Sequence, residues 1–264
     1  MKKGMFTLLI IVLMIAFVGC NSAQGTEGQG EESQQSQGKD TLVVGTSADF
    51  PPFESHEVVE GKDMIVGFDI DLLNEIAKEL DVDIKIEDID FNGLVAAVQT
   101  GKIDMAISGM TPKPDRLEKV DFSDSYFKAS QALLVKKGIA KDIDSMDRLK
   151  GKIVASQLGT TSDDVISSFE GIEVKKYNRT NDAVLDLNNG RVEAVIIEDT
   201  IAKAYVDKNP GIEAVIPEDL NEEEEPFAIA LPKGEKELLD KINGALKNIK
   251  DSGKYDELVE KWFE

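Results

Sequence analysis

The sequence predicts an α/β protein made of two similar lobes, each a mainly parallel β-sheet with helices on both faces. Three observations lead to this fold class. Hydrophobic residues make up 41% of the 264 residues and charged residues 31%, a balance typical of chains with packed cores. Short β-branched runs alternate with segments of helical spacing, the pattern of a parallel sheet with crossover helices. A unit of helix, glycine and strand also occurs twice, which indicates two lobes.

The first part of the domain contains three predicted strands and two predicted helices. Gly101 ends the second helix, because glycine readily adopts the left-handed conformation found after a helix C-terminus. In chain order, these elements are the strand Thr41–Gly45, the helix Asp69–Leu80, the strand Asp83–Ile89, a helix through Leu94, Val95 and Val98, and the strand Ile103–Ile107.

The same alternation restarts further along the chain. It leads to two final helices, which we expect to pack on the first lobe. In chain order, the predicted elements are the strand Ala132–Val135, the strand Lys152–Ser156, the helix Asp163–Phe169, the strand Val174–Tyr177, the helix Asn181–Leu187, the strand Val192–Ile197, the helix Thr200–Val206, the strand Pro226–Leu231, and the helices Leu238–Ile249 and Tyr255–Phe263.

Residues 94–107 and 183–196 carry the repeated unit. In each, a helix is followed by a glycine, Gly101 or Gly190, then by a basic residue and an apolar strand with an acidic second position. A match of this kind also arises by chance in α/β proteins. If it is real, the chain has two similar lobes with a cleft between them.

Two crossover strands, Ala132–Val135 and Pro226–Leu231, would join the lobes. The predicted first lobe is 41–131 together with 226–264, and the second is 132–225. In open α/β sheets, ligands bind beyond the carboxyl ends of the strands. The side chains at those ends are therefore the candidate site residues.

The N-terminal segment predicts export and membrane attachment. Lys2 and Lys3 precede a short apolar run that ends at Gly19 and Cys20, which resembles a bacterial lipoprotein signal despite Phe17 in the cleavage motif. We expect residues 1–19 to be a signal peptide, and residues 20–40 to be a lipidated Cys20 followed by a disordered tether rich in Gly, Ser, Gln and Glu. The alternative is an uncleaved signal anchor with an unused thiol.

The composition excludes several functional classes. The chain has 30 Lys and Arg against 51 Asp and Glu, a net charge of −21, which argues against a nucleic-acid partner. One cysteine excludes an intrachain disulfide framework and a multi-cysteine zinc site. Because His56 is the only histidine, a metal site or a Ser-His-Asp triad is improbable. We expect no cofactor and no metal.

Polar residues follow the strand Ile103–Ile107. Ser108, Gly109 and Thr111 offer hydroxyls, free amides and close backbone approach, and Pro114 begins a predicted helix whose N-terminus favours an anion. Arg116 has the fork geometry that fits a carboxylate. The alternative for Arg116 is a surface ion pair with Glu118 or Asp115.

The second lobe offers a matching set of polar residues. Thr160 and Thr161 could contact an anion, with Ser162 as the predicted N-cap of the next helix. No Gly-Lys-Ser/Thr is present, which disfavours a nucleotide P-loop. Asp199, after Val192–Ile197, could cap a helix or face Arg116 across the cleft. The second arrangement is complementary to a zwitterion, with a carboxylate at Arg116 and an ammonium at Asp199.

These motifs, in this order, resemble the solute-binding proteins of ABC importers for polar amino acids, over Thr41 to Glu264. The resemblance implies a two-lobed periplasmic-binding-protein-like fold of type II, in which Phe50 and Phe91 sandwich the ligand. It also implies that Arg116, Thr111 and Thr161 hold the ligand carboxylate, and that Asp199 and the Ser108–Gly109 carbonyl region hold the ammonium. The motifs are Gly45–Glu54, Val66–Leu72, Asp90–Leu94, Gly101–Asp104, Ser108–Thr111 with Arg116, Val120–Ser123, Gly159–Thr161 and Asp199.

The family resemblance also predicts the ligand and the mechanism. The run Val154–Thr161 looks most like arginine-binding members, and Asp49 or Glu198 could serve a guanidinium, so we expect arginine or another basic or polar amino acid. The side-chain end of the pocket should be lined by Ser47, Asp49, Phe50, Phe91, Gln157 and Glu198.

We expect an extracytoplasmic, monomeric binding protein that closes around its ligand by hinge motion and delivers it to a permease. It is not expected to be an enzyme. Two alternatives of the same fold remain open: a secreted dehydratase, for which Glu198 is the evident acid or base, and a tethered ligand sensor.

Overall fold

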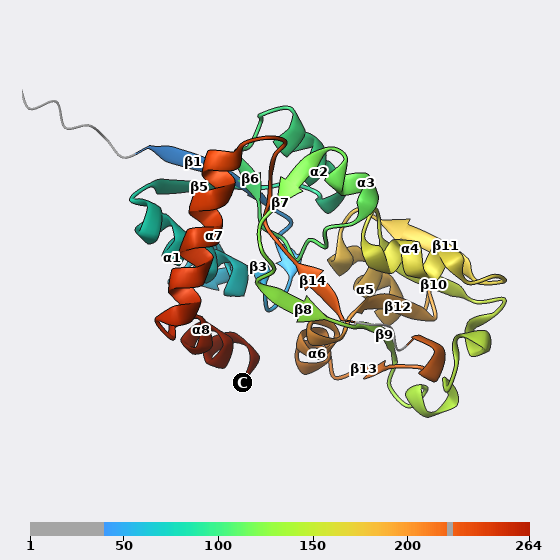
Figure 1. The fold of residues 1–264 in the computed structure, drawn as a ribbon. Coiled ribbons are helices and arrows are strands. Elements are labelled where there is room, and N and C mark those ends of the chain that lie inside the picture. Colours follow the sequence, from blue (N-terminus) through green and yellow to red (C-terminus); the bar gives the residue numbers. More distant parts are fainter. Residues whose placement is uncertain (1–39, 221–223) are drawn as a thin grey trace, which may run out of the picture. The chain divides into compact units, whose positions relative to one another are not determined.

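A computed structural model of the protein describes residues 40–220 and 224–264 (Figure 1). The predicted signal peptide, Cys20 and the predicted tether up to residue 39 lie outside this part of the chain. Within the described residues, the helices are all too short or too polar to span a lipid bilayer.

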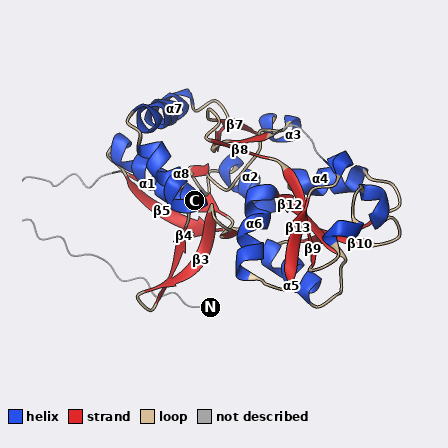
Figure 2. Ribbon diagram, turned by 90° about the horizontal axis from the view of Figure 1, so that it is seen from below, coloured by secondary structure: helices blue, strands red, loops and turns tan. Residues whose placement is uncertain are grey.

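The first lobe is built on a five-stranded sheet of order β5-β1-β6-β15-β7. β1 pairs in parallel with β5 and β6, and β15 is antiparallel to β6 and β7. Helices α1, α7 and α8 pack together beside this sheet (Figures 1 and 2). The elements of this lobe are β1 (Thr41–Thr46), α1 (Phe68–Leu80), β5 (Asp83–Asp88), α2 (Phe91–Gln99), β6 (Met105–Ala106), α3 (Pro114–Leu117), β7 (Val120–Phe122), β15 (Ala230–Pro232), α7 (Lys236–Asp251) and α8 (Lys254–Phe263).

The second lobe repeats this plan with a sheet of order β11-β10-β12-β9-β13. Three parallel strands are again followed by an antiparallel strand, β9, and by β13, which pairs antiparallel to β9. Its elements are β9 (Gln131–Lys136), η1 (Ala140–Asp142), η2 (Met146–Leu149), β10 (Ile153–Gln157), α4 (Thr161–Ser168), β11 (Glu173–Tyr177), α5 (Thr180–Asn188), β12 (Ala194–Glu198), α6 (Asp199–Lys208), β13 (Ile212–Val215) and η3 (Glu218–Leu220).

Two small sheets complete the described chain. A three-stranded sheet joins β2 (Asp49–Phe50), β3 (Glu54–Val59) and β4 (Lys62–Val66), and β8 (Phe127–Ala129) pairs with β14 (Glu225–Phe227). β8 leads directly into β9, and β14 is followed by β15. The two passages between the lobes therefore run antiparallel to each other.

The first predicted crossover strand was placed incorrectly, and the second overlaps the observed passage at Pro226 and Phe227. Residues Ala132–Val135 lie inside the second sheet, paired with β12 and β13, and the passage itself is the β8–β14 pair. The predicted strand Pro226–Leu231 is two short strands, because the amide of Ala228 donates to the Met110 carbonyl and that of Ile229 to Ser123 Oγ. With these bonds, the amides of Ala228 and Ile229 do not pair with a neighbouring strand, so β14 ends at Phe227 and β15 begins at Ala230.

The internal repeat is confirmed as a structural unit. Gly101 after α2 and Gly190 after α5 have φ values of 69° and 71°, in the left-handed region that favours glycine. The acidic position of each repeat is also structural. Asp104 Oδ2 accepts a 2.7 Å hydrogen bond from the backbone N of Val43, and Glu193 Oε2 accepts a 3.0 Å bond from that of Ile153. In both lobes the acid thus ties the loop to the neighbouring parallel strand.

A cluster of aromatic rings forms the core beside the crossover. Phe53 is fully buried at its centre, and its ring centroid lies 4.9–5.9 Å from those of Phe68, Phe127, Phe227 and Phe263. The edge-to-face geometry is favourable for aromatic pairs. The cluster joins α1, α8 and both crossover strands, so it fixes the base of the crossover to the first lobe.

Candidate functional site

A cavity lies between the two lobes, at the carboxyl ends of their strands; the space between its atoms is about 290 Å³, including a part open to solvent. Every residue that lines it is one of the predicted ligand-binding residues. They are Ser47, Phe50, Phe91, Ser108, Gly109, Thr111, Arg116, Gln157, Thr160, Thr161 and Glu198. The predicted ligand-binding residues Asp49 and Asp199 do not line it. Among residues 40–220 and 224–264, His, Cys, Asp and Glu side chains form no group of three that could hold a metal ion.

The positive side of the cavity is Arg116 in α3. Arg116 is 4% exposed, so the alternative of a surface ion pair is wrong. Its guanidinium donates to the Thr111 carbonyl at 2.7 Å and, across the cleft, to the Gly159 carbonyl at 2.8 Å. It also lies 5.1 Å from the centroid of the Phe91 ring. Burial lowers the pKa of Arg116 from its ordinary value, but a guanidinium remains charged in proteins.

The predicted helix at Pro114 is a single turn, from Pro114 to Leu117. Such a short helix supplies little dipole. The positive charge at this side of the cavity therefore comes from the Arg116 guanidinium rather than from a helix terminus.

The loop of Ser108 and Gly109 forms the floor of the first-lobe side. Gly109 has a φ of 50°, and a Cβ at this position would lie 2.8 Å from Cε1 of Phe50. Glycine therefore lets the Phe50 ring lie directly against the backbone. Ser108 Oγ accepts from the backbone N of Ser47 at 3.0 Å and donates to Glu54 Oε1 at 2.6 Å.

Two buried carboxyl groups hold this loop from below. Glu54 and Asp69 are both fully buried and lie within hydrogen-bonding reach of each other. Asp69 Oδ2 accepts from the Gly109 backbone N at 3.1 Å and from the Tyr126 hydroxyl at 2.8 Å. Burial raises the pKa of Asp69 to about 6, and burial together with the charge of Asp69 raises the pKa of Glu54 well above its usual value. Two such groups titrate as a coupled pair, because the charge of one disfavours ionisation of the other.

The second-lobe side is built on the N-terminus of α4. Thr160, and not Ser162, is the N-cap: Thr160 Oγ1 accepts from the backbone N of Asp163 at 3.1 Å. Ser162 is already inside the helix, and its hydroxyl donates to Gln131 Oε1 at 2.8 Å. Thr161, the first residue of α4, lies at the cavity, where the helix dipole favours a negative charge.

Glu198 supplies the acidic group of the cavity. It ends β12, is 4% exposed and lines the cavity together with Arg116. Burial raises the pKa of Glu198 to about 7, with further contributions from the charges of Glu225 and Asp199, while Arg116 acts in the opposite direction. A buried carboxyl group with a raised pKa is a common feature of binding sites.

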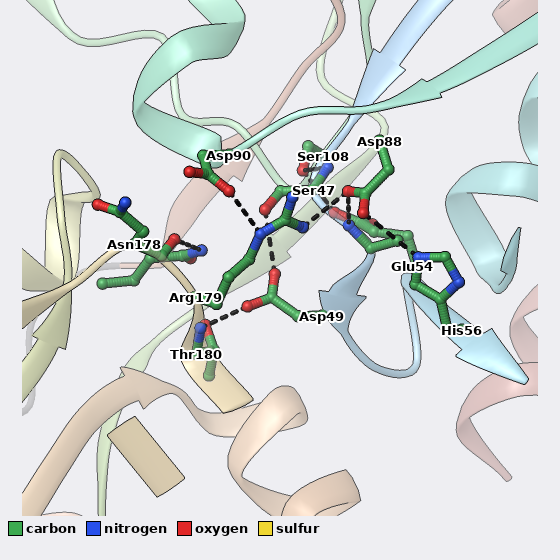
Figure 3. A network of polar contacts seen from close by, with 12 residues as sticks. Ser47, Asp49, Glu54, His56, Asp88, Asp90, Ser108, Asn178, Arg179 and Thr180 are labelled. Carbon is green, nitrogen blue, oxygen red and sulfur yellow. Dashed lines mark hydrogen bonds and ion pairs between the residues drawn. The ribbon is translucent and has the colours of Figure 1, made fainter. Parts of the chain in front are cut away.

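The other two predicted acids are engaged elsewhere. Asp49 is 3% exposed, and its carboxylate accepts from Ser47 Oγ at 3.0 Å and from the backbone N of Thr180 in the second lobe (Figure 3). The Asp199 carboxylate accepts from the backbone N of Thr200 at 2.7 Å and of Ser130 at 3.4 Å. The helix-capping alternative for Asp199 is wrong, because Asp199 is the first residue of α6 and Glu198 occupies the N-cap position.

Comparison with known proteins places this arrangement among transport proteins. The arginine-binding extracellular protein ArtP of Bacillus subtilis (strain 168) is 38% identical over 266 residues, which cover 100% of this chain and 98% of that protein. The substrate-binding protein of an amino acid ABC transporter has a crystal structure that matches with a TM-score of 0.81 and 47% identity, over 84% of this chain and 99% of that one. An ancestral arginine-binding protein solved with arginine bound matches with a TM-score of 0.79 and 46% identity, over 86% and 99%.

The family model of the bacterial extracellular solute-binding proteins, family 3, matches residues 42–264. This match covers nearly all of the two lobes. It also agrees with the two-lobed α/β architecture and with the cavity between the lobes. The chain therefore belongs to family 3 of the bacterial extracellular solute-binding proteins.

Proposed function

We propose that the protein binds one free polar amino acid, with arginine as the best candidate, in the cavity between the lobes and delivers it to the permease of an ABC importer. The observation that carries this proposal is the charge arrangement of the cavity. A buried guanidinium from the first lobe and a buried carboxyl group from the second line the same enclosed space. Such a space is complementary to a ligand that carries both charges.

The ligand carboxylate would lie at Arg116, with Thr111, Thr161 and the first turn of α4 as further donors. Two carbonyls already orient the guanidinium of Arg116, so the ligand meets a fixed donor. The ammonium would lie at the Ser108–Gly109 region, on the side of Asp199, the first residue of α6.

The side chain of the ligand would lie between the apolar rings of Phe50 and Phe91. Its far end would meet Ser47 and Gln157, with Glu198 as the partner of a cationic group. Two findings support arginine: a guanidinium would pair with the buried Glu198, and the relatives reported above include arginine-binding proteins. A neutral polar amino acid would leave the Glu198 carboxyl group without a cationic partner.

Delivery would follow closure of the lobes around the ligand. Bonds such as Arg116 to Gly159 already cross the cleft, and ligand contacts from both sides would favour this closed form. We further propose that the mature chain is a monomer outside the cytoplasm, anchored by a lipid on Cys20. The lipoprotein-like signal and the membership in an extracellular family support this location.

A thermal-shift screen of the wild-type protein against all amino acids tests the ligand class, because a ligand of the folded state alone raises Tm with its affinity. Mass spectrometry of the recovered ligand separates binding from the dehydratase alternative, in which the ligand would be converted. If no amino acid raises Tm, the proposal is wrong.

Arg116→Ala tests the site. It should weaken binding about 30-fold or more, because it removes the partner of a buried ligand charge. Arg148→Ala is the matched control, since Arg148 is exposed and pairs with Asp144, four residues earlier in the chain. Unchanged affinity in Arg116→Ala would remove that residue from the site.

A further inference from the structure

A second set of charged contacts crosses between the lobes, outside the cavity. Arg179 precedes α5 of the second lobe, and Asp88 and Asp90 lie at the end of β5 and before α2 of the first (Figure 3). Arg179 Nε donates to Asp90 Oδ1 at 2.6 Å, and Arg179 Nη1 donates to Asp88 Oδ1 at 2.7 Å. One side chain thus joins two carboxylates of the opposite lobe.

The neighbouring backbone adds two more contacts between the lobes. The amide of Thr180, next to Arg179, donates to the carboxylate of Asp49 in β2. The hydroxyl of Tyr205 in α6 donates to the Asp49 backbone carbonyl at 2.8 Å. Asp49 is therefore bound by residues of two helices of the second lobe. This predicted ligand-binding residue contacts those helices and does not line the cavity.

Asp88, which accepts from Arg179, also contacts His56 of its own lobe. His56 Nε2 lies 3.3 Å from Asp88 Oδ2, and His56 Nδ1 lies 3.0 Å from Asp63 Oδ2. The backbone N of Ala48 donates to Asp88 Oδ1 at 3.1 Å. The carboxylate that receives Arg179 is thus fixed by contacts within its own lobe. Such a preorganised acceptor loses little freedom when Arg179 arrives.

None of Asp49, Asp88, Asp90 and Arg179 lines the ligand cavity. Their bonds exist only while the lobes are together, because each joins atoms of different lobes. They therefore contribute to the free energy of the closed form without lining the cavity. The Arg179 side chain is 25% exposed and that of Asp90 is 42% exposed, so solvent and salt weaken their interaction only in part.

We propose that Arg179, with Asp88, Asp90 and Asp49, is a latch that sets the affinity for every ligand through closure of the lobes and does not choose among ligands. Arg179 is in this sense a positioning residue. The proposal rests on the proposed function, because a latch acts only if the ligand is bound by closure. The apparent dissociation constant equals the intrinsic constant divided by the fraction of molecules in the competent form. Loss of the latch therefore multiplies all dissociation constants by one factor.

The test is the affinity of Arg179→Ala, compared with wild type, for L-arginine and for each other amino acid that the wild-type protein binds. We expect every affinity to fall by the same factor, about 5- to 30-fold for two partly exposed charge pairs, with faster dissociation. Arg148→Ala, which removes an exposed arginine paired within the second lobe, should change nothing. Asp90→Asn should give a smaller uniform loss, and Arg179→Lys should restore part of the affinity.

Two results would overturn the latch. One is unchanged affinity in a folded Arg179→Ala protein. The other is a loss that differs between ligands, because it would make Arg179 a specificity residue.

Small-angle scattering measures how compact the protein is as ligand is added. A purely structural role of Arg179 would not change the ligand concentration at which the protein becomes compact. The variant should need more ligand to become compact, yet reach the wild-type dimensions at saturation. Failure of the wild-type protein to bind any amino acid would contradict the proposed function instead, so the two failures are distinguishable. If Arg179→Ala does not fold, Asp90→Asn and Arg179→Lys carry the same test.

Discussion

Replacing Glu198 with glutamine should remove most of the pH dependence of arginine binding between pH 6 and pH 8. The side chain of Glu198 is 4% exposed at the cavity wall, and burial raises its pKa to about 7. A cationic group of the ligand interacts favourably only with the ionised carboxylate. Binding should therefore strengthen as the pH rises and this group loses its proton.

The magnitude follows from this pKa. With a pKa of about 7, roughly one molecule in eleven is ionised at pH 6 and ten in eleven at pH 8, so the affinity should rise about tenfold. The effect of pH on the stability of the ligand-free protein has the opposite sign to its effect on affinity. The unfolded-state pKa is near 4.5, so protonation of Glu198 stabilises the ligand-free fold below that pH. This contribution, about 3 kcal/mol, is lost as the pH rises through about 7.

Isothermal titration of wild type and Glu198→Gln with L-arginine, at pH 6, 7 and 8 and constant ionic strength, measures this effect. Asp69, whose pKa is raised to about 6, adds its own pH dependence, so the measurement is the difference between the two proteins. Glu237→Gln, on the exposed face of α7 where Glu237 pairs with Lys241, is the matched control and should follow wild type. A tenfold rise that persists in Glu198→Gln would refute the role of Glu198.

Three further predictions concern the frame of the site. Gly109→Ala should lower stability by about 1–3 kcal/mol and weaken binding, since its φ is 50° and the new Cβ would meet the Phe50 ring; urea unfolding and titration measure both. Phe53→Ala should cost about 3–5 kcal/mol in urea unfolding, because it empties the centre of the aromatic cluster. Raising the pH through about 6 should destabilise the ligand-free protein as Asp69, buried beside Glu54, loses its proton, and Asp69→Asn should reduce this loss of stability in unfolding curves at pH 5 and pH 8.

Much of the fold follows from local signals in the sequence. The predicted helix Asp69–Leu80 is observed as Phe68–Leu80, and Gly101 follows the end of α2 as expected. These signals are hydrophobic spacing and the conformational freedom of glycine, which act within a few residues. The alternation of strands and helices then gives the parallel part of each sheet.

Features that depend on distant partners were missed or misplaced. Ser162 was the predicted N-cap of α4, but Thr160 takes this role while Ser162 donates to Gln131 of β9. The hairpin of β3 and β4 was missed for a local reason: in its tight turn Glu60 and Gly61 both have positive φ, but Glu60 stands where Asn or Asp is the usual signal.

The residues of the candidate site also fall into those that local sequence signals reveal and those that depend on distant partners. Its cavity residues follow strands or begin helices, and such positions converge at one edge of a sheet, so Arg116 and Glu198 could be found from the sequence. The partners of Glu54 and Arg179 lie far along the chain: Asp69 beneath the loop and Asp90 on the opposite lobe. No spacing rule pairs them, because Glu54 and Asp69 meet through the packing of β3 against α1, and Arg179 meets Asp90 through the orientation of the two lobes.

The proposed cavity and latch therefore affect binding in different ways: the cavity sets the preference among ligands, and the latch sets the affinity for all of them. In the proposed site, Arg116 would meet the carboxylate that all amino acids share, whereas the contact of Glu198 with the ligand side chain would differ between ligands and so set which amino acid is preferred. Contacts such as Arg179 to Asp90 are the same for every ligand and raise or lower all affinities together. A substitution at the latch would then adjust the concentration range in which the protein works without changing its preference, whereas a substitution at Glu198 would change the preference itself.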